Sequence, residues 1–364
     1  RTCCRLSSVG RRHRHLRLAL ALVAAAALVA LRWWRDRDTT ELERATSYAP
    51  ADAQRLSWTD WAAVREAVGA VGTDLDGSSS AGEVRRFLDR GFDRDLTSTS
   101  ALVQSAEVMQ AHFGFSPATA DWELFSQADD GAVVIVRVPD DTDLDAIADD
   151  LERSGFTRPA TDPTGGGVWS GGSGLLPEIG ADLTPELQYV ALDADEHLVL
   201  TSDNKAYLQQ TVDHLGDGSI PDGMQDVVAA SGSPLSAAVY DGPYACSALA
   251  MGHADPSAQR EADQLVAEAG EVNPVTGFAM SAQPGGDVLV ALGFETDDQA
   301  RTNADTRSVL ASGPAPGQGG DFSDRFSVAS ATADGSVVTL DLVPTDGSYV
   351  LSDLSTGPVL FATC

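Results

Sequence analysis

Apolar and polar positions follow the same order four times along the chain: two strand-like runs around a short turn, then a helix-like run. The clearest copy spans residues 275–310, where VTGFAMSAQ and VLVALGFE flank the turn PGGD and TDDQARTNADTRSVL follows. Short apolar runs on both sides of a Gly-rich turn predict a β-hairpin. The polar run after the hairpin, with apolar residues at helical spacing, predicts a helix.

Similar runs at residues 122–138, 187–201 and 325–343 predict three more hairpins. Each hairpin is followed by a hydroxyl residue and an aspartate, a pair that we interpret as a helix start. The pairs are Thr142 and Asp143, Ser202 and Asp203, Thr296 and Asp297, and Thr345 and Asp346. A side-chain oxygen at a helix start accepts a hydrogen bond from an unpaired N–H, which contributes about 1 kcal/mol. The alternative is that the four aspartates face one groove and bind a cation.

Three helices are predicted before the first hairpin. They span Ser57–Val68, a segment that starts at Ser80 and ends near Gly91, and Ser100–Phe113. Ser57 and Ser80 each stand three residues before an acid, which is the arrangement of a capping box. The preceding polar residues 36–55 predict a stalk.

Three tryptophans allow either a core or a binding role. Trp58 and Trp61 are at helical spacing and indicate core positions, with an aromatic binding platform as the alternative. The Gly-rich segment TGGGVWSGGSG, residues 164–174, predicts a surface loop. Its alternative role is a flexible lip over a pocket that contains Trp169.

The recurring unit predicts an α+β fold. In this fold, repeated β-hairpin-helix units form antiparallel sheets backed by helices, preceded by an N-terminal helical segment. Two such sheets are the simplest packing, and the unequal spacing of the copies excludes a solenoid. The predicted parts are a basic flank plus signal anchor or transmembrane segment (1–35), a stalk and helical subdomain (36–120), a first hairpin-helix domain (121–230) and a second hairpin-helix domain (231–364).

An apolar run at residues 18–31 follows the basic sequence RRHRHLR and precedes RWWRDRD. A basic flank before an apolar run is typical of a signal peptide or a signal anchor. No small-residue cleavage site follows Leu31, and Trp33 and Trp34 suit a bilayer interface, so a retained anchor is favoured. The positive-inside rule then places the N-terminus in the cytoplasm and the C-terminal part outside the membrane. Secretion after cleavage of a signal peptide is the alternative.

The charge of the chain excludes nucleic acid as a partner. The 364 residues carry a net charge of −30 at pH 7, although residues 1–38 contain nine Arg and only two Asp. The remainder therefore holds 15 basic and 52 acidic residues. Such a surface repels phosphate backbones, whose binding depends on Lys and Arg.

The four cysteines fall on both sides of the apolar run. Cys3 and Cys4 precede it, whereas Cys246 and Cys364 follow it and would face an oxidising exterior. We predict a disulfide between Cys246 and Cys364, which would stabilise the fold by roughly 4 to 5 kcal/mol in the chain-entropy model. Two free buried thiols are the alternative.

Common catalytic and cofactor motifs do not occur in the sequence. The six histidines are scattered, and neither HExxH nor paired CxxC is found, so no zinc site is predicted. Leu175 replaces the last glycine that a nucleophile elbow would need in SGGSGLL. Phosphate-binding and dinucleotide-binding glycine motifs are also missing. We therefore predict neither a metal nor a cofactor.

The acidic residues do not identify a site by their spacing. Asp140, Asp141, Asp143 and Asp145 form a cluster that lacks the spacing and central glycine of an EF-hand, as does the segment 74–85. We interpret both as solvent-exposed faces, with calcium-dependent adhesion as a weaker alternative. A pair of catalytic carboxylates cannot be selected from 54 acidic residues without geometry, so the catalytic residues, if any, are unknown.

Several stretches of the chain after residue 55 resemble a group of extracytoplasmic, membrane-anchored proteins of actinobacteria with no assigned activity. The stretches are LSWTDW, FGFSPATADWELF, LTPELQYVALDAD, YACSALAM, QARTNADTRSVLASGPAPGQGGDFSDRFSV and VLSDLSTGPVLFATC. The resemblance implies a location in the cell envelope. It implies no catalytic or binding residues.

The sequence therefore favours a non-enzymatic, membrane-tethered extracytoplasmic protein. We expect it to bind an envelope protein or a small ligand in a cleft between its two hairpin-helix domains. The alternative is an envelope hydrolase whose carboxylates converge only in the fold.

Overall fold

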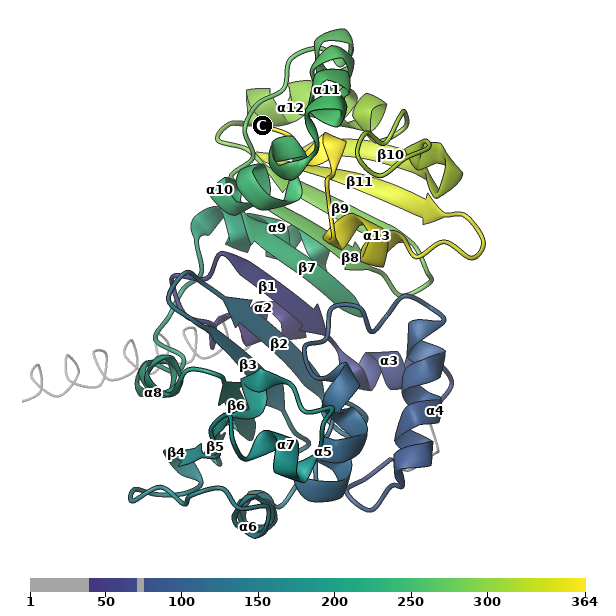
Figure 1. Cartoon of the computed structure of the whole chain (residues 1–364). Coiled ribbons are helices and arrows are strands. Elements are labelled where there is room, and N and C mark those ends of the chain that lie inside the picture. Colours follow the sequence, from purple (N-terminus) through teal and green to yellow (C-terminus); the bar gives the residue numbers. More distant parts are fainter. Residues whose placement is uncertain (1–38, 71–74) are drawn as a thin grey trace, which may run out of the picture.

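One antiparallel sheet of 11 strands forms the centre of the molecule, in a computed structural model that describes residues 39–70 and 75–364 (Figure 1). The strand order is β10-β11-β9-β8-β7-β1-β2-β3-β6-β5-β4. The strands are β1 (Arg55–Thr59), β2 (Trp122–Gln127), β3 (Ala132–Arg137), β4 (Gly165–Ser170), β5 (Tyr189–Asp193), β6 (Leu198–Ser202), β7 (Ser236–Asp241), β8 (Gly277–Ala282), β9 (Val288–Gly293), β10 (Phe326–Asp334) and β11 (Val337–Pro344).

The sheet consists of two halves whose first five strands follow the same order, and the first half has a sixth strand, β4, without a counterpart. The first half runs outward from the centre as β1-β2-β3-β6-β5-β4, and the second runs as β7-β8-β9-β11-β10. Strands β1 and β7 pair antiparallel at the centre, with Ser57 opposite Ala238. The predicted fold class, antiparallel sheets of hairpin-helix units backed by helices, is confirmed. The two predicted sheets are continuous with each other, because the first strand of each half pairs with its counterpart.

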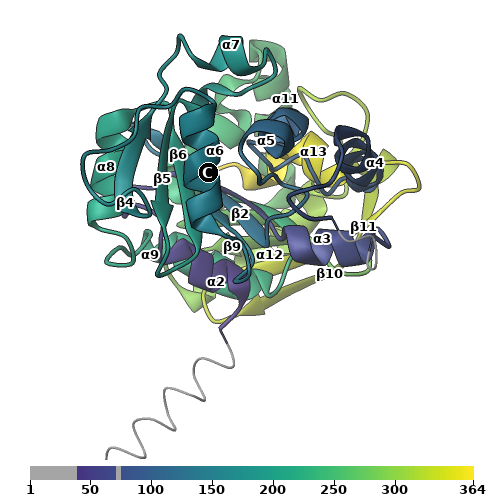
Figure 2. The ribbon, with the colours of Figure 1, turned by 90° about the horizontal axis from the view of Figure 1, so that it is seen from below.

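Helices cover both faces of the sheet (Figure 2). The α-helices are α2 (Glu41–Thr46), α3 (Trp61–Ala67), α4 (Ala81–Phe92), α5 (Ala106–His112), α6 (Leu144–Arg153), α7 (Leu176–Ile179), α8 (Lys205–Asp213), α9 (Asp222–Ser231), α10 (Gly242–Tyr244), α11 (Pro256–Ala269), α12 (Asp297–Leu310) and α13 (Val350–Ser355). Shorter helical turns span Val103–Ser105, Pro185–Leu187, Ala245–Leu249, Met251–His253, Phe322–Asp324 and Leu360–Ala362.

Two hydrophobic cores lie on opposite faces of the sheet. Helices α2, α8 and α9 pack on one face, which we call the back face, around residues such as Trp58 and Met224. The larger front core lies under α3 to α7 and α11 to α13, around residues such as Phe278. Alternate residues of the central strands belong to different cores, as in β3, where Val133 is in the back core and Val134 in the front core.

The predicted helix Ser57–Val68 is wrong in its first part. Its N-terminal residues form β1, and α3 starts only at Trp61, after Asp60 accepts a hydrogen bond of 2.8 Å from the N–H of Ala63. Trp58 and Trp61 are three residues apart, as on one face of a helix. In the structure, however, Trp58 lies in the back core and Trp61 in the front core. Both are essentially inaccessible to solvent, so their core interpretation is confirmed.

Two segments predicted as irregular are ordered elements. The predicted stalk, residues 36–55, contains α2, whose Leu42 and Ala45 are buried in the back core. The Gly-rich segment forms β4 at the edge of the sheet, and its Trp169 is buried and donates a hydrogen bond to the carbonyl of Pro163. Trp169 therefore does not lie in a pocket beneath a loop.

Two of the four predicted helix starts are helix caps. Asp143 accepts hydrogen bonds from the N–H groups of Asp145 and Ala146 at the start of α6, so the capping residue is Asp143 and not Thr142. Thr296 caps α12, and Asp297 is its first residue. The local chemistry at these sites is that predicted from the sequence.

The other two predicted helix starts are corrected by the structure. Ser202 is the last residue of β6, and Asn204, after Asp203, caps α8. Thr345 and Asp346 do not start a helix. The N–H of Ser348 donates to the carbonyl of Thr345, which closes a turn, and α13 begins only at Val350.

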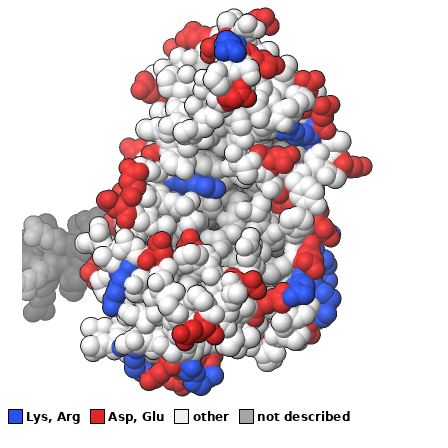
Figure 3. Space-filling view, viewed as in Figure 1, with Lys and Arg blue, Asp and Glu red and all other residues white. Residues whose placement is uncertain are grey.

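The predicted membrane segment, residues 18–31, and the cysteines Cys3 and Cys4 lie outside the described residues. Within residues 39–70 and 75–364, no helix has the length and apolar character needed to cross a bilayer. Acidic side chains are spread over both halves on the face shown in Figure 3.

Candidate functional site

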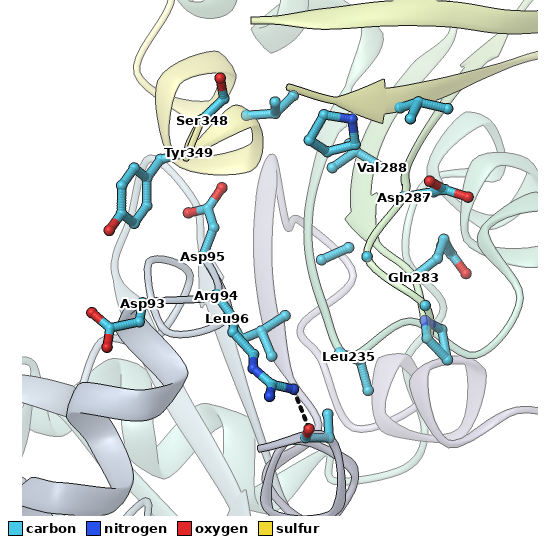
Figure 4. Close-up of a pocket in the computed structure, with 18 of the residues that line it drawn as sticks. Asp93, Arg94, Asp95, Leu96, Leu235, Gln283, Asp287, Val288, Ser348 and Tyr349 are labelled. Carbon is cyan, nitrogen blue, oxygen red and sulfur yellow. Dashed lines mark hydrogen bonds between the residues drawn. The ribbon is translucent and has the colours of Figure 1, made fainter. Parts of the chain in front are cut away.

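A cavity of about 940 Å³ lies where the two halves meet, and we call it the inter-half groove. The first half contributes α3 and the segment 93–96 after α4, and the second contributes the β8–β9 turn and the segment 343–350. Figure 4 shows these segments facing one another across the cavity. The groove is therefore built from segments far apart in the sequence.

The groove has apolar walls near the sheet. Leu96, Leu235, Val288 and Val350 line it and are buried. Val343 also lines it, and 42% of its surface remains exposed. Val343 is therefore the large apolar lining residue with substantial exposed surface, while the four buried side chains form the base of the groove.

Carboxylates surround this apolar surface. Five acidic residues line the groove, namely Glu66, Asp93, Asp95, Asp287 and Asp346. Arg94 is the one basic residue among the lining side chains that the structure describes, and its guanidinium donates to the carbonyl oxygen of Ala67. The groove is therefore acidic, and its one cation already binds the protein.

Asp95 links the two halves across the groove. Its backbone has φ of 57°, a left-handed conformation that aspartate adopts more readily than most residues. Its Oδ2 accepts a hydrogen bond of 3.1 Å from the N–H of Ser352, in the first turn of α13. Burial raises the pKa of Asp95 to about 6, against the lowering effect of its hydrogen bonds to backbone amides.

The Asp95 contact replaces a missing local cap. Tyr349 precedes α13 and makes no capping hydrogen bond from its side chain, so the helix amides need another acceptor. The carboxylate from the first half supplies it. The wall of the groove formed by segment 345–350 is thus held by a contact between the halves.

An aromatic pair, exposed Phe92 and half-buried Tyr349, stands beside the groove. The rings of Phe92 and Tyr349 have centroids 5.5 Å apart, and Phe92 is 60% exposed. Tyr349 lines the cavity. Exposed apolar rings beside a cavity are typical of interaction sites.

A second cavity of about 830 Å³ lies on the other side of α3, and we call it the α3 cleft. Tyr48 and Trp122 form its aromatic lining, with ring centroids 6.3 Å apart. Burial raises the pKa of Asp60 and of Asp121, both of which line the cleft. Burial also raises the pKa of Tyr48 to about 12, supported by its hydrogen bond to Glu196.

Glu123 is the most deeply buried carboxylate of this region, but its contacts are those of a structural residue. Its oxygens accept hydrogen bonds from the indole N–H of Trp61 at 3.1 Å, the hydroxyl of Ser100 at 2.8 Å and the N–H of Ala101 at 2.7 Å. Burial raises its pKa. The carboxylate joins β2 to α3 and to the segment before α5, and it has no contact with either cavity.

The four predicted aspartates do not form one site. Asp346 lines the inter-half groove, whereas Asp143 and Asp297 lie at the starts of two different helices and Asp203 precedes α8. In the part of the chain that the structure describes, no group of three or more His, Cys, Asp or Glu residues is arranged to hold a metal ion.

The predicted disulfide is present in the structure. Cys246 and Cys364 are bonded, with their Cα atoms 5.6 Å apart. The bond fixes the C-terminal residue to the segment after α10. It lies away from the inter-half groove, whose lining contains neither cysteine.

The central residues of the groove were not identified from the sequence. Asp95 and Tyr349 come together across 254 residues of chain, and no local pattern relates them. The sequence of Phe92 to Leu96 shows only a polar segment after a helix. Neither the positive φ of Asp95 nor its contact with a distant helix can be predicted from a local sequence pattern.

The sequence matches no protein-family model and no curated protein. Among solved structures, crystal form I of TP0453 is similar over 87% of this chain and 97% of that chain, with 8% identity and a TM-score of 0.39. Crystal form III of TP0453 gives 86% and 98% coverage, again with 8% identity and a TM-score of 0.39. Similarity at this level indicates neither a shared fold nor a shared function.

Proposed function

We propose that the protein is a membrane-tethered, extracytoplasmic binding module whose ligand enters the inter-half groove. One observation carries this proposal: a cavity of about 940 Å³ between the halves that combines apolar walls with a charged rim. Ligand sites in proteins commonly have volumes of about 300 to 1,000 Å³, with apolar walls and a few polar groups that fix orientation. The groove has both properties.

The lining favours binding over catalysis. Neither His nor Cys is among the described residues that line the groove. The hydroxyl groups of Thr345 and Ser348, which could act as nucleophiles, therefore have no imidazole base beside them. The carboxylate of Asp95, which has a raised pKa, is already engaged by the N–H of Ser352. These groups suit recognition of a ligand better than activation of a nucleophile.

The tether and the extracytoplasmic location are supported by sequence features on both sides of the apolar run. The basic flank and the apolar residues 18–31 support the tether. The disulfide between Cys246 and Cys364 supports an oxidising compartment. The resemblance to extracytoplasmic actinobacterial proteins fits the same location. Protease treatment of intact cells should degrade the C-terminal part, and full protection in intact cells would reject this location.

Cross-linking from inside the groove tests the binding function. A photoreactive amino acid is placed at Gln283 or at Ser348, which both line the groove, and at the exposed Asp334 as a control. The tethered chain is irradiated in native envelopes and purified. We expect the same adduct from both groove positions and none from the control. Equal labelling at all three positions, or no adduct from the groove, would contradict the proposal.

A second candidate function, hydrolysis in the α3 cleft, is supported by the raised pKa values of Asp60 and Asp121. Carboxyl groups with raised pKa values serve as general acids in glycoside hydrolysis. The full chain would then release reducing ends from isolated envelope polysaccharide, and Asp121→Asn would abolish the release. No release by the unmodified chain would reject this candidate.

A further inference from the structure

The inter-half groove and the α3 cleft are neighbouring cavities. Ala63 and Glu66 of α3 line both of them. The two cavities therefore lie side by side along the same helix, next to the exposed Glu66. We call the combined surface the trough. With about 940 Å³ on one side and about 830 Å³ on the other, it exceeds the usual volume of a site for one small molecule.

The trough is strongly acidic along both parts. Five carboxylates line the groove and seven line the cleft, with Glu66 belonging to both. The three arginines of the trough already have partners in the protein: Arg44 pairs with Glu41 at 2.7 Å, Arg137 pairs with Asp140 at 2.5 Å, and Arg94 donates to a backbone carbonyl. Most of the negative charge is thus left without a cation from the protein itself.

Apolar side chains are exposed at one end of this acidic surface. Three large apolar residues are markedly exposed in the described part of the chain, and two of them, Phe92 and Val343, lie at the groove. Phe92 contacts Tyr349, and Val343 lines the cavity. A ligand that matches the trough must therefore carry both positive charge and apolar groups.

We infer that the trough binds an extended, basic segment of a partner protein in which arginine or lysine residues alternate with apolar residues. This inference rests on the proposed binding function. Charge complementarity favours a cationic ligand, and the extent of the two joined cavities favours a polypeptide over a free amine. The basic side chains meet carboxylates such as Asp93, Asp141, Asp287 and Asp346. An apolar side chain of the segment packs on Val343 and Tyr349.

The test compares two variants with the same net charge. The trough variant carries Asp93→Asn, Asp141→Asn, Asp287→Asn and Asp346→Asn, all at exposed positions that line the trough. The control variant carries Asp203→Asn, Asp226→Asn, Asp305→Asn and Asp334→Asn, all exposed and outside it. Each change retains the size of the side chain.

The probe is a fluorescein-labelled peptide with alternating Arg and Leu, and binding to the full chain in detergent is measured by fluorescence anisotropy. We expect the trough variant to bind at least about tenfold more weakly than the unmodified chain, and the control variant to change affinity by less than about twofold. A companion peptide with Ser in place of Leu should bind the unmodified chain more weakly. Val343→Ser should abolish that difference between the peptides.

Several outcomes would overturn the inference. Equal weakening in both variants would assign binding to the overall negative charge. Tight binding of free spermine, with no binding of the peptide, would assign the trough to a small cation. Stronger peptide binding after Arg11, Arg12, Arg14 and Arg17 are changed to Gln would assign it to the chain's own basic segment. Failure of the peptide alongside successful cross-linking from Gln283 and Ser348 would reject the ligand class and retain the binding function.

Discussion

The helices α8 and α13 follow corresponding strands of the two halves, yet they cover opposite faces of the sheet. Tyr207 and Leu208 of α8 pack into the back core, beneath the strands of the first half. Val350 and Leu354 of α13 pack into the front core and contact β8, near the centre of the sheet. The helix that follows the corresponding strand therefore packs on a different face of the sheet in each half.

The difference arises in the length of the connection. Two residues join β6 to α8, whereas five residues, 345–349, join β11 to α13. The longer connection contains Gly347 at φ of 82° and allows the chain to cross to the other face. As a result, the back of β10 and β11 stays exposed and α13 moves beside the first half. The inter-half groove exists because the second half does not repeat the first.

The largest expected effect on stability concerns the disulfide of the second half. The described residues of the first half contain no disulfide, whereas Cys246 and Cys364 close a loop with a sequence separation of 118. Replacing both cysteines with Ser should destabilise the protein by about 4 to 5 kcal/mol in the chain-entropy model. Urea unfolding followed by tryptophan fluorescence measures this loss. Reductant should destabilise the unmodified chain and leave the variant unchanged.

The next largest effect concerns the buried cation of α12. Arg307 is inaccessible to solvent, its NH groups donate to the carbonyls of Phe361, Thr363 and Asn273, and burial lowers its pKa to about 10. Arg307→Ala leaves these acceptors unpaired beside a cavity and should cost about 3 to 4 kcal/mol.

The matched control for Arg307 is Arg153 of α6, an exposed arginine paired with Asp150. Arg153→Ala should cost less than about 1 kcal/mol, because exposed ion pairs contribute little. Urea midpoints of both variants give the comparison. Similar decreases in stability for the two variants would contradict the predicted difference between a buried and an exposed arginine.

The caps of α8 and α13 give an intermediate effect. Asn204 caps α8 from its own chain segment, with hydrogen bonds of 3.0 and 3.2 Å, whereas Asp95 caps α13 from the other half. Removing either cap by substitution with Ala should cost about 1 to 2 kcal/mol at about pH 4, where the buried carboxyl of Asp95 carries no charge in the folded protein. Only Asp95→Ala should also weaken ligand binding in the groove. Loss of binding in both variants would contradict a local role for Asp95.

Asp95→Asn removes the charge of the side chain and retains an oxygen that can accept the capping hydrogen bond. Because burial raises the pKa of Asp95 to about 6, the folded state binds a proton between about pH 4 and 6 that the unfolded state releases. The stability from this carboxyl is therefore complete below about pH 4 and is lost as the pH rises through 6. Relative to the unmodified chain, Asp95→Asn should gain about 1 to 2 kcal/mol between pH 4.5 and 7.5, allowing for solvent screening. A stability difference that does not change with pH would contradict this assignment.

The smallest effect concerns Gly347 in the long connection. Its φ of 82° disfavours other residues, and an added Cβ meets no atom within 4 Å. Gly347→Ala should therefore cost about 1 kcal/mol through backbone strain alone. Gly216, at φ of 79° after α8 and with equal space around it, is the matched control. Both variants should unfold at similar urea concentrations, and only Gly347→Ala should change ligand affinity.

Patterns within short segments predicted much of the fold. The runs around 122–138 and 275–293 each consist of two short apolar stretches around a turn, as hairpins do, and the structure contains β2–β3 and β8–β9 there. The strand β1 was missed, because Trp58 and Trp61 are spaced as on a helix while they face different cores. Strand β4 was missed because its glycines resemble those of a loop, whereas pairing with β5 orders them.

Only one side of the site was predicted from the sequence. The predicted cleft lay between the hairpin-helix domains 121–230 and 231–364, whereas the inter-half groove has no lining residue from 121–230. Its first-half wall, α3 and the segment 93–96, belongs to the predicted helical subdomain 36–120. The residues of the groove were not predicted, apart from Asp346, which had been interpreted as a helix start. Asp95, Phe92 and Tyr349 become neighbours through the crossing of the connection 345–349, which depends on tertiary packing rather than on local propensity.

The pairing of β1 with β7 also determines how the groove can respond to a ligand. Hydrogen-bonded strands at the centre of a continuous sheet act as a rigid bridge, so the halves have no hinge about which to close. Any adjustment of the groove must come from its rim, where the β8–β9 turn and the connection 345–349 face the solvent. Adjustment of the groove to the proposed ligand would thus occur by loop movement, with the two halves held at a fixed separation.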